Sequence, residues 1–167
     1  MQCLEAIEEL HRIGFIHRDI KPSNFTTGRS SLIHGVRKIY LIDFGFSFQY
    51  VDSNDRVKRL HKNMSFKGTM RYAALASHLG RPPSRRDDLE SWMYQQVELT
   101  KGVLPWKNAE DELDIISAKE SVRTNDGMHK LMRACPKSYV DIMKYIASLH
   151  KRSRPDYDYI YKVHNLL

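Results

Sequence analysis

Two short segments of the sequence carry side chains suited to phosphate chemistry. The first spans residues 17–24 and reads HRDIKPSN, and the second is DFG at residues 43–45. An ionised carboxylate such as Asp19 can accept or orient the proton of a hydroxyl group. Amide and carboxylate oxygens, such as those of Asn24 and Asp43, are the kind of ligand that Mg²⁺ prefers. Together the segments predict a site for phosphoryl transfer.

The spacing within these segments adds two further roles. Phosphoryl transfer needs the nucleophile aimed and the phosphate charge neutralised, and Lys21 can place a positive charge on the group in flight. Gly45 allows a sharp turn directly after the metal ligand. A DFG tripeptide alone is weak evidence, whereas the first segment, with six fixed positions, is much stronger evidence. The order of the two segments along the chain favours a catalytic site over a solvated loop followed by an unrelated turn.

The elements that must position these residues are mainly helical. Apolar residues 39–42 predict a buried strand that ends at the DFG segment, residues 25–27 a short strand, and residues 28–31 a turn. Residues 49–67 have little periodicity and predict a long surface loop. Apolar residues at helical spacing predict helices at 4–13, 87–101, 108–122, 136–149 and 155–163. The expected class is α+β, mainly helical with a small β element.

Composition and charge narrow the class of protein. Apolar residues make up 41% of the 167 residues, which excludes wholesale disorder, and no apolar run is long enough to span a membrane. The first residues lack the pattern of a signal peptide, so the cytoplasm or the nucleus is the expected location. The two cysteines lie far apart, which argues against a zinc site or a disulfide framework. The net charge of +7 would suit nucleic acid, but no nucleic-acid-binding motif supports such a partner.

With these motifs in view, the sequence resembles the catalytic domain of a eukaryotic protein kinase. More narrowly it resembles the casein-kinase-one group and its tau-tubulin kinase-like branch, over nearly the whole chain. The segments that carry the narrower resemblance are GTMRYA at 68–73, SRRDDLES at 84–91, LPW at 104–106 and RPDY at 154–157. The resemblance implies a serine/threonine kinase that uses ATP and Mg²⁺ to phosphorylate proteins.

The resemblance also implies a role for each matching residue. Asp19 would orient the substrate hydroxyl, and Lys21 would assist it as a second catalytic residue. Thr69 would hydrogen-bond to both. Asn24 and Asp43 would hold Mg²⁺ and, through it, the phosphates of ATP.

Other positions either support residues 17–24, which the resemblance makes the catalytic loop, or depart from the family pattern. Asp88 would anchor the backbone of that loop from within a helix. Residues 74–76 read ALA, where most kinases carry Ala-Pro-Glu and casein-kinase-one relatives carry Ser-Ile-Asn. Met93 stands where most kinases have glycine, and an enlarged turn is expected around residues 29–37. These departures predict altered docking of the 74–76 segment and altered local packing.

The sequence before the catalytic loop lacks the parts that cover ATP in a kinase. We find no glycine-rich loop, no lysine of the V-A-I-K type and no partner glutamate there. The expected domain, residues 1–167, is therefore a partial protein kinase domain: the C-terminal lobe, with the N-terminal lobe absent. Such a fragment is expected to be inactive alone. The alternative is a non-catalytic binding or scaffold module built on the same lobe.

Protein substrates are the expected partners. Five basic residues, Lys67, Arg71, Arg81, Arg85 and Arg86, would attract acidic or pre-phosphorylated substrate segments, a preference known for the casein-kinase-one group. Arginine is well suited to bidentate phosphate contacts. Scattered solvated charge explains the same residues equally well.

Overall fold

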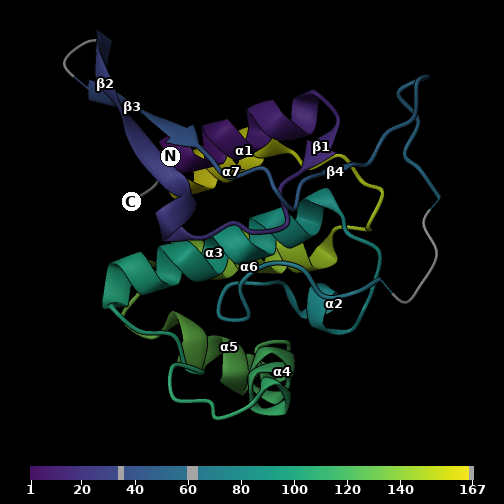
Figure 1. Ribbon diagram of the computed structural model, residues 1–167. Helices are drawn as coiled ribbons and strands as arrows, with labels where there is room; N and C mark the ends of the chain where they lie inside the picture. Colours follow the sequence, from purple (N-terminus) through teal and green to yellow (C-terminus); the bar gives the residue numbers. More distant parts are fainter. Residues whose placement is uncertain (34–35, 60–63, 166–167) are drawn as a thin grey trace.

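The computed structural model describes residues 1–33, 36–59 and 64–165 of the chain (Figure 1). In these ranges it has seven α-helices, one short 3₁₀ helix and two antiparallel pairs of strands. This agrees with the expected mainly helical architecture with a small β element. Among the described residues, no helix has both the length and the apolar character needed to cross a bilayer.

The bounds of the elements follow the chain from its N-terminus. The strands are β1 (Phe15–Ile16), β2 (Phe25–Ile33), β3 (Val36–Leu41) and β4 (Phe48–Gln49), and the 3₁₀ helix is Pro22–Asn24. The helices are α1 (Gln2–Arg12), α2 (Leu75–His78), α3 (Arg85–Lys101), α4 (Glu112–Ser121), α5 (Asn125–Met132), α6 (Lys137–Ser148) and α7 (Tyr157–His164).

The core is organised around α3. Figure 1 shows α3 lying along α6, with α1 and α7 on one side of this pair and α4 and α5 on the other. Most of α3 is buried, including Leu89, Trp92 and Met93, because neighbouring helices cover more than one of its faces. A helix enclosed in this way is a rigid support for whatever is attached to it.

Local sequence explains where α3 begins and ends. The backbone N–H of Ser84 donates to the Asp87 carboxylate at 2.7 Å, which forms a capping box, so the helix starts two residues before the predicted position. Gly102 follows the helix with φ of +79°, a left-handed conformation that glycine adopts without strain. Burial and the nearby Glu90 carboxylate raise the pKa of Asp87 to about 7, although its bonds to Ser84 act in the opposite direction.

The two strand pairs differ from the sequence prediction. The turn expected at residues 28–31 is wrong, because these residues continue β2, which pairs with β3 through a register shift between Thr27 and Leu32. The enlarged turn expected around residues 29–37 is this pair of strands, and residues 34–35 lie outside the described residues. The strand predicted at 39–42 is not buried throughout, since Ile42 is 40% exposed. The pairing of β1 with β4 has no signal in the pattern.

Two helices are absent from the sequence prediction. Helix α2 has four residues, too few for a recognisable periodicity. Helix α5 contains Gly127, which argues against a helix locally. The structure requires glycine there, because a Cβ at residue 127 would lie 1.9 Å from the carbonyl oxygen of Ser121. Part of the loop predicted at 49–67, residues 60–63, lies outside the described residues.

The buried position of Met93 predicts a large cost for truncating it. We expect Met93→Ala to lower the free energy of unfolding by about 2–4 kcal/mol, because it leaves a cavity in the core. Leu99→Ala on the same helix is the control, since Leu99 is 63% exposed, and should change stability by less than about 0.5 kcal/mol. Urea denaturation measures both, and equal losses would contradict the assigned core.

Candidate active site

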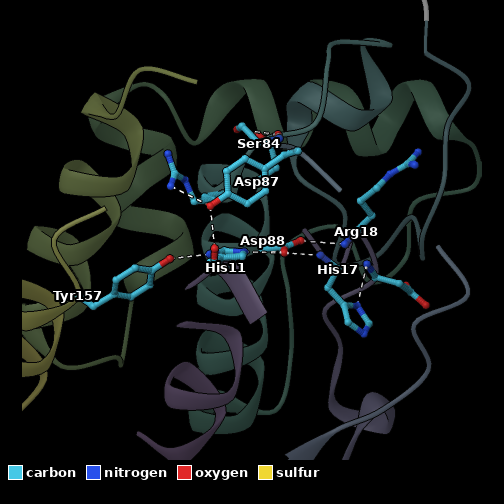
Figure 2. A network of polar contacts seen from close by, with 10 residues as sticks. His11, His17, Arg18, Ser84, Asp87, Asp88 and Tyr157 are labelled. Atoms are coloured by element: carbon cyan, nitrogen blue, oxygen red, sulfur yellow. Dashed lines mark hydrogen bonds and ion pairs between the residues drawn. The ribbon is translucent and has the colours of Figure 1, made fainter. Parts of the chain in front are cut away.

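The HRD loop (residues 17–24) is attached to the middle of the molecule by one buried carboxylate. Asp88 of α3 accepts the backbone N–H of His17 at 2.7 Å and that of Arg18 at 2.9 Å, using one oxygen for each (Figure 2). Hydrogen bonds to an ionised acceptor are stronger than neutral ones. They hold Arg18 at φ of +73°, a conformation that costs a non-glycine residue about 1–2 kcal/mol. The contacts expected of an aspartate that anchors the loop backbone are therefore present at Asp88.

Asp88 is itself held from behind by His11 and Tyr157. The Nε2 atom of His11 lies 2.9 Å from the Asp88 carboxylate, and its Nδ1 lies 2.5 Å from the Tyr157 hydroxyl. Because a carboxylate only accepts, Nε2 carries the hydrogen and Nδ1 accepts from tyrosine. Burial raises the pKa of Tyr157, which keeps this hydroxyl protonated and able to donate. Residues from α1, α3 and α7 thus meet behind the loop.

His17 ties the HRD loop to the end of β3. Its Nε2 lies 3.0 Å from the carbonyl oxygen of Ile42, while the Ile42 N–H donates to the carbonyl of Asn24 at 2.9 Å. The Nδ1 atom of His17 accepts the backbone N–H of Asp19 at 3.3 Å. With both backbone groups of Ile42 bonded to the loop, the next residue, Asp43, is brought beside it.

Four of the predicted site residues form one polar cluster. The Asp19 carboxylate accepts the Thr69 hydroxyl at 2.8 Å and lies 2.7 Å from the Lys21 ammonium. Lys21 also donates to the Thr69 hydroxyl at 3.0 Å. The Asn24 side-chain amide donates to the backbone carbonyl of Asp19 at 2.9 Å, which leaves its amide oxygen available to a metal ion. Residues that are 50 positions apart thereby surround one carboxylate.

Asp43 stands apart from this cluster. It is exposed at a left-handed φ of +64°, and its carboxylate accepts the N–H of Gly45 at 3.4 Å. The described contacts join it to Asn24 through Ile42. These two oxygen donors fit Mg²⁺, which takes few ligands from protein and the rest from water and phosphate. The described residues contain no group of three or more His, Cys, Asp or Glu side chains placed to hold a metal without such help.

Gly68 lets the Thr69 hydroxyl reach Asp19. Its φ is +110°, and a Cβ on it would lie 2.5 Å from the carbonyl oxygen of Arg18. The backbone before Thr69 therefore runs against the HRD loop with room only for glycine. This close approach gives a physical reason for the glycine that precedes the threonine.

The five basic residues expected to attract acidic substrates do not form one patch. Arg85 donates to the Tyr50 hydroxyl and to the backbone carbonyls of residues 152 and 153, and Arg86 donates to the carbonyl of Leu149. Arg71 forms an ion pair with Glu98. These three guanidinium groups are thus bonded to other parts of the same chain. The remaining two, Lys67 and Arg81, line a small hollow together with Arg18.

The chain is similar to known proteins along almost its whole length. The family model described as the protein kinase domain matches residues 1–164. The chain is 34% identical over 160 residues to a probable serine/threonine-protein kinase of Dictyostelium discoideum, covering 96% of this chain and 31% of that protein. It is 31% identical over 159 residues to the serine/threonine-protein kinase spe-6 of Caenorhabditis elegans, covering 93% of this chain and 41% of that protein. The chain therefore spans well under half the length of these relatives.

The buried contacts of Asp88 predict a large effect on stability. We expect Asp88→Ala to lower the free energy of unfolding by about 2–5 kcal/mol, because it leaves two backbone N–H groups and His11 without their acceptor. Glu110→Ala, at an exposed acidic residue, is the control and should change stability by less than about 0.5 kcal/mol. Thermal unfolding followed by circular dichroism measures both. An Asp88→Ala protein as stable as its control would refute the anchoring role.

Proposed function

The chain belongs to the protein kinase family, and on this premise we propose that it carries the catalytic residues of a serine/threonine kinase. In this proposal the γ-phosphoryl group of ATP passes to a hydroxyl group of a protein substrate. The observation that carries the proposal is the cluster around Asp19, in which Lys21, Asn24 and Thr69 all contact one residue. A carboxylate held from several sides is already oriented when the substrate arrives, which lowers the barrier to reaction.

Asp19 would aim the nucleophile. The hydroxyl oxygen of the substrate would form a bond to the γ-phosphorus. At the same time the bond between the γ-phosphorus and the bridging oxygen would break, that oxygen would leave with ADP, and the hydroxyl proton would move to the Asp19 carboxylate. Thr69 and Asn24 would keep this carboxylate in place. The Lys21 ammonium lies 2.7 Å from Asp19 on a side chain that is partly exposed, so it can contact the carboxylate and a phosphate oxygen in turn.

Asn24 and Asp43 would hold Mg²⁺ together with the nucleotide phosphates. The ion would supply positive charge to the leaving ADP. The chain's contribution is that Ile42, whose N–H donates to the carbonyl of Asn24, directly precedes Asp43, so the backbones of the two residues are tied together. The exposure of Asp43 suits a ligand that must also meet solvent and phosphate.

We further propose that residues 1–167 form the C-terminal lobe of the kinase domain, within the casein-kinase-one group and its tau-tubulin kinase-like branch. The mainly helical architecture and the segments at 68–73 and 84–91 support this. Phe44 and Phe46, beside Asp43, are 51% and 43% exposed. Large apolar side chains exposed next to a candidate site support a second lobe packing over this face.

Substitution of the two acidic site residues tests the proposed reaction. In the protein at its full native length, Asp19→Asn and Asp43→Asn should each lower phosphate incorporation into serine or threonine by at least about a hundredfold. The reason is that each loses a carboxylate with a separate role, one for the hydroxyl proton and one for the metal. Asp141→Asn, on the exposed face of α6, is the matched control and should keep full activity.

Two outcomes would contradict the proposal. Activity retained in Asp19→Asn would remove this residue from the reaction. No transfer by the unaltered full-length protein, under conditions where it is folded, would favour the alternative of a binding or scaffold module.

We also propose that the substrates are acidic or already phosphorylated. Arg18, Lys67 and Arg81 line one hollow beside the HRD loop, which places positive charge close to the candidate site. We expect Lys67→Glu combined with Arg81→Glu to reduce the preference for a phosphorylated peptide over its unphosphorylated form by about tenfold or more. Lys130→Glu combined with Lys144→Glu, at exposed positions, has the same change in charge and should leave the preference unaltered. Equal preference for the phosphorylated peptide in both double variants would show that this hollow does not select phosphorylated substrates.

A further inference from the structure

The turn that carries Thr69 (residues 69–73) is held by a buried lysine. Lys119 of α4 is 0% exposed, and its ammonium lies 2.6 Å from the carbonyl oxygen of Met70 and 2.6 Å from that of Ala73. Between these two carbonyls, that of Arg71 accepts the indole N–H of Trp106 at 2.8 Å. Side chains from later in the chain thus bond three carbonyls of one short turn.

The third donor of the Lys119 ammonium also has a partner. It lies 3.0 Å from Nε2 of His78, whose Nδ1 lies 2.9 Å from the Glu112 carboxylate. A neutral His78 with its hydrogen on Nδ1 donates to Glu112 and accepts from Lys119, so both ring nitrogens of His78 and the three donors of the Lys119 ammonium have partners. The rings of Tyr94 and Trp106 flank the ammonium at 5.4 and 5.2 Å, which are favourable cation–π distances.

Burying a lysine here costs desolvation free energy unless hydrogen bonds to the ammonium offset it. Burial lowers the pKa of Lys119 to about 7, while the carboxylates of Glu90 and Glu112 act in the opposite direction. An apolar side chain of similar length would fill the same space with no charge to desolvate. The contribution that only the amine makes is its set of hydrogen bonds to the turn and to His78.

The turn transmits this hold to the candidate site. The backbone N–H groups of Tyr72 and Ala73 both donate to the carbonyl of Thr69, at 3.0 and 2.9 Å, so the turn moves as one unit. The Thr69 hydroxyl in turn donates to Asp19. A shift at Met70 or Ala73 would therefore move the Thr69 hydroxyl relative to the Asp19 carboxylate.

The next segment, residues 74–76, is held by a second buried charge. It lacks the glutamate that the family resemblance leads one to expect, yet the N–H of Leu75 donates to Glu90 of α3 at 3.1 Å. Glu90 also accepts the Tyr94 hydroxyl at 2.8 Å and pairs with Arg123 at 2.6 Å. The carboxylate that bonds this segment is thus supplied by α3, and Lys119 holds the residues just before it.

We propose that Lys119 is a positioning residue for phosphoryl transfer, which holds the Thr69 turn so that Thr69 stays in contact with Asp19 and the substrate peptide meets a fixed surface. The inference rests on the proposed kinase function for its effect on the reaction. Its effect on the turn does not depend on that function. The ammonium does not reach the reacting groups, so Lys119 acts through the turn alone.

Hydrogen–deuterium exchange and kinetics together test this role in Lys119→Met. Methionine keeps the unbranched apolar stem and removes all donors. We expect peptides covering residues 68–76 to exchange at least about tenfold faster, while protection of α6 is unchanged. In the full-length protein, kcat/KM for a peptide substrate should fall about tenfold or more, with KM for ATP unaltered. Lys144→Met, at an exposed lysine of α6, is the matched control and should resemble the unaltered protein.

Each remaining outcome decides the inference. Unchanged exchange at residues 68–76 overturns it, and so does a rise in KM for ATP equal to that for peptide, which would indicate a general structural role. If the unaltered protein transfers no phosphate, the proposed function fails, and exchange alone then decides whether Lys119 holds the turn. If Lys119→Met loses α6 protection as well, Lys119→Gln replaces it, since glutamine keeps two N–H donors. Because glutamine retains donors, an increase at residues 68–76 smaller than that of Lys119→Met supports the role. An increase as large as that of Lys119→Met, or one that again includes α6, refutes it.

Discussion

The candidate site depends on the hydrogen bonds that the buried carboxylate of Asp88 accepts. This carboxylate bonds the first two backbone N–H groups of the HRD loop and is itself bonded by His11, which Tyr157 supports from α7 (Figure 2). Because Asp88 lies on the most enclosed helix, the start of the loop is fixed to the core, and bonds within the loop then position Asp19. A buried charge with three donors is stable only while all of them are present, so loop, core and C-terminal helix constrain one another.

A second set of buried charges positions the other half of the site. Lys119 and Glu90 hold the segment that follows Gly68, one through its carbonyl oxygens and the other through a backbone N–H. The Asp19 carboxylate is therefore the meeting point of two segments, each fixed separately to the helical core. In the proposed reaction, such an arrangement would need little adjustment before phosphoryl transfer, which is where preorganised electrostatic sites gain most.

Most of the candidate site residues predicted from the sequence lie together in the structure, whereas the β elements were predicted less well. The motifs singled out Asp19, Lys21 and Asn24, the family resemblance added Thr69, and the structure brings these four together while Asp43 stands apart. Apolar spacing predicted the long helices, because their periodicity is local. The pairing of β2 with β3 was missed, since Gly28 and its polar neighbours locally favour a turn while the pairing partner lies further along the chain. The contact of His11 with Tyr157 joins residues 146 positions apart, and no spacing within either segment reveals it.

Amide hydrogen exchange measured by NMR at the first two residues of the HRD loop tests the central claim most directly. If the buried carboxylate anchors this loop, the amides of His17 and Arg18 exchange only when the whole domain unfolds. Their free energies of exchange should then equal those of Ile142 and Ile146 in the core of α6. Exchange of these two amides at the rate of an exposed loop, while α6 remains protected, would contradict the account.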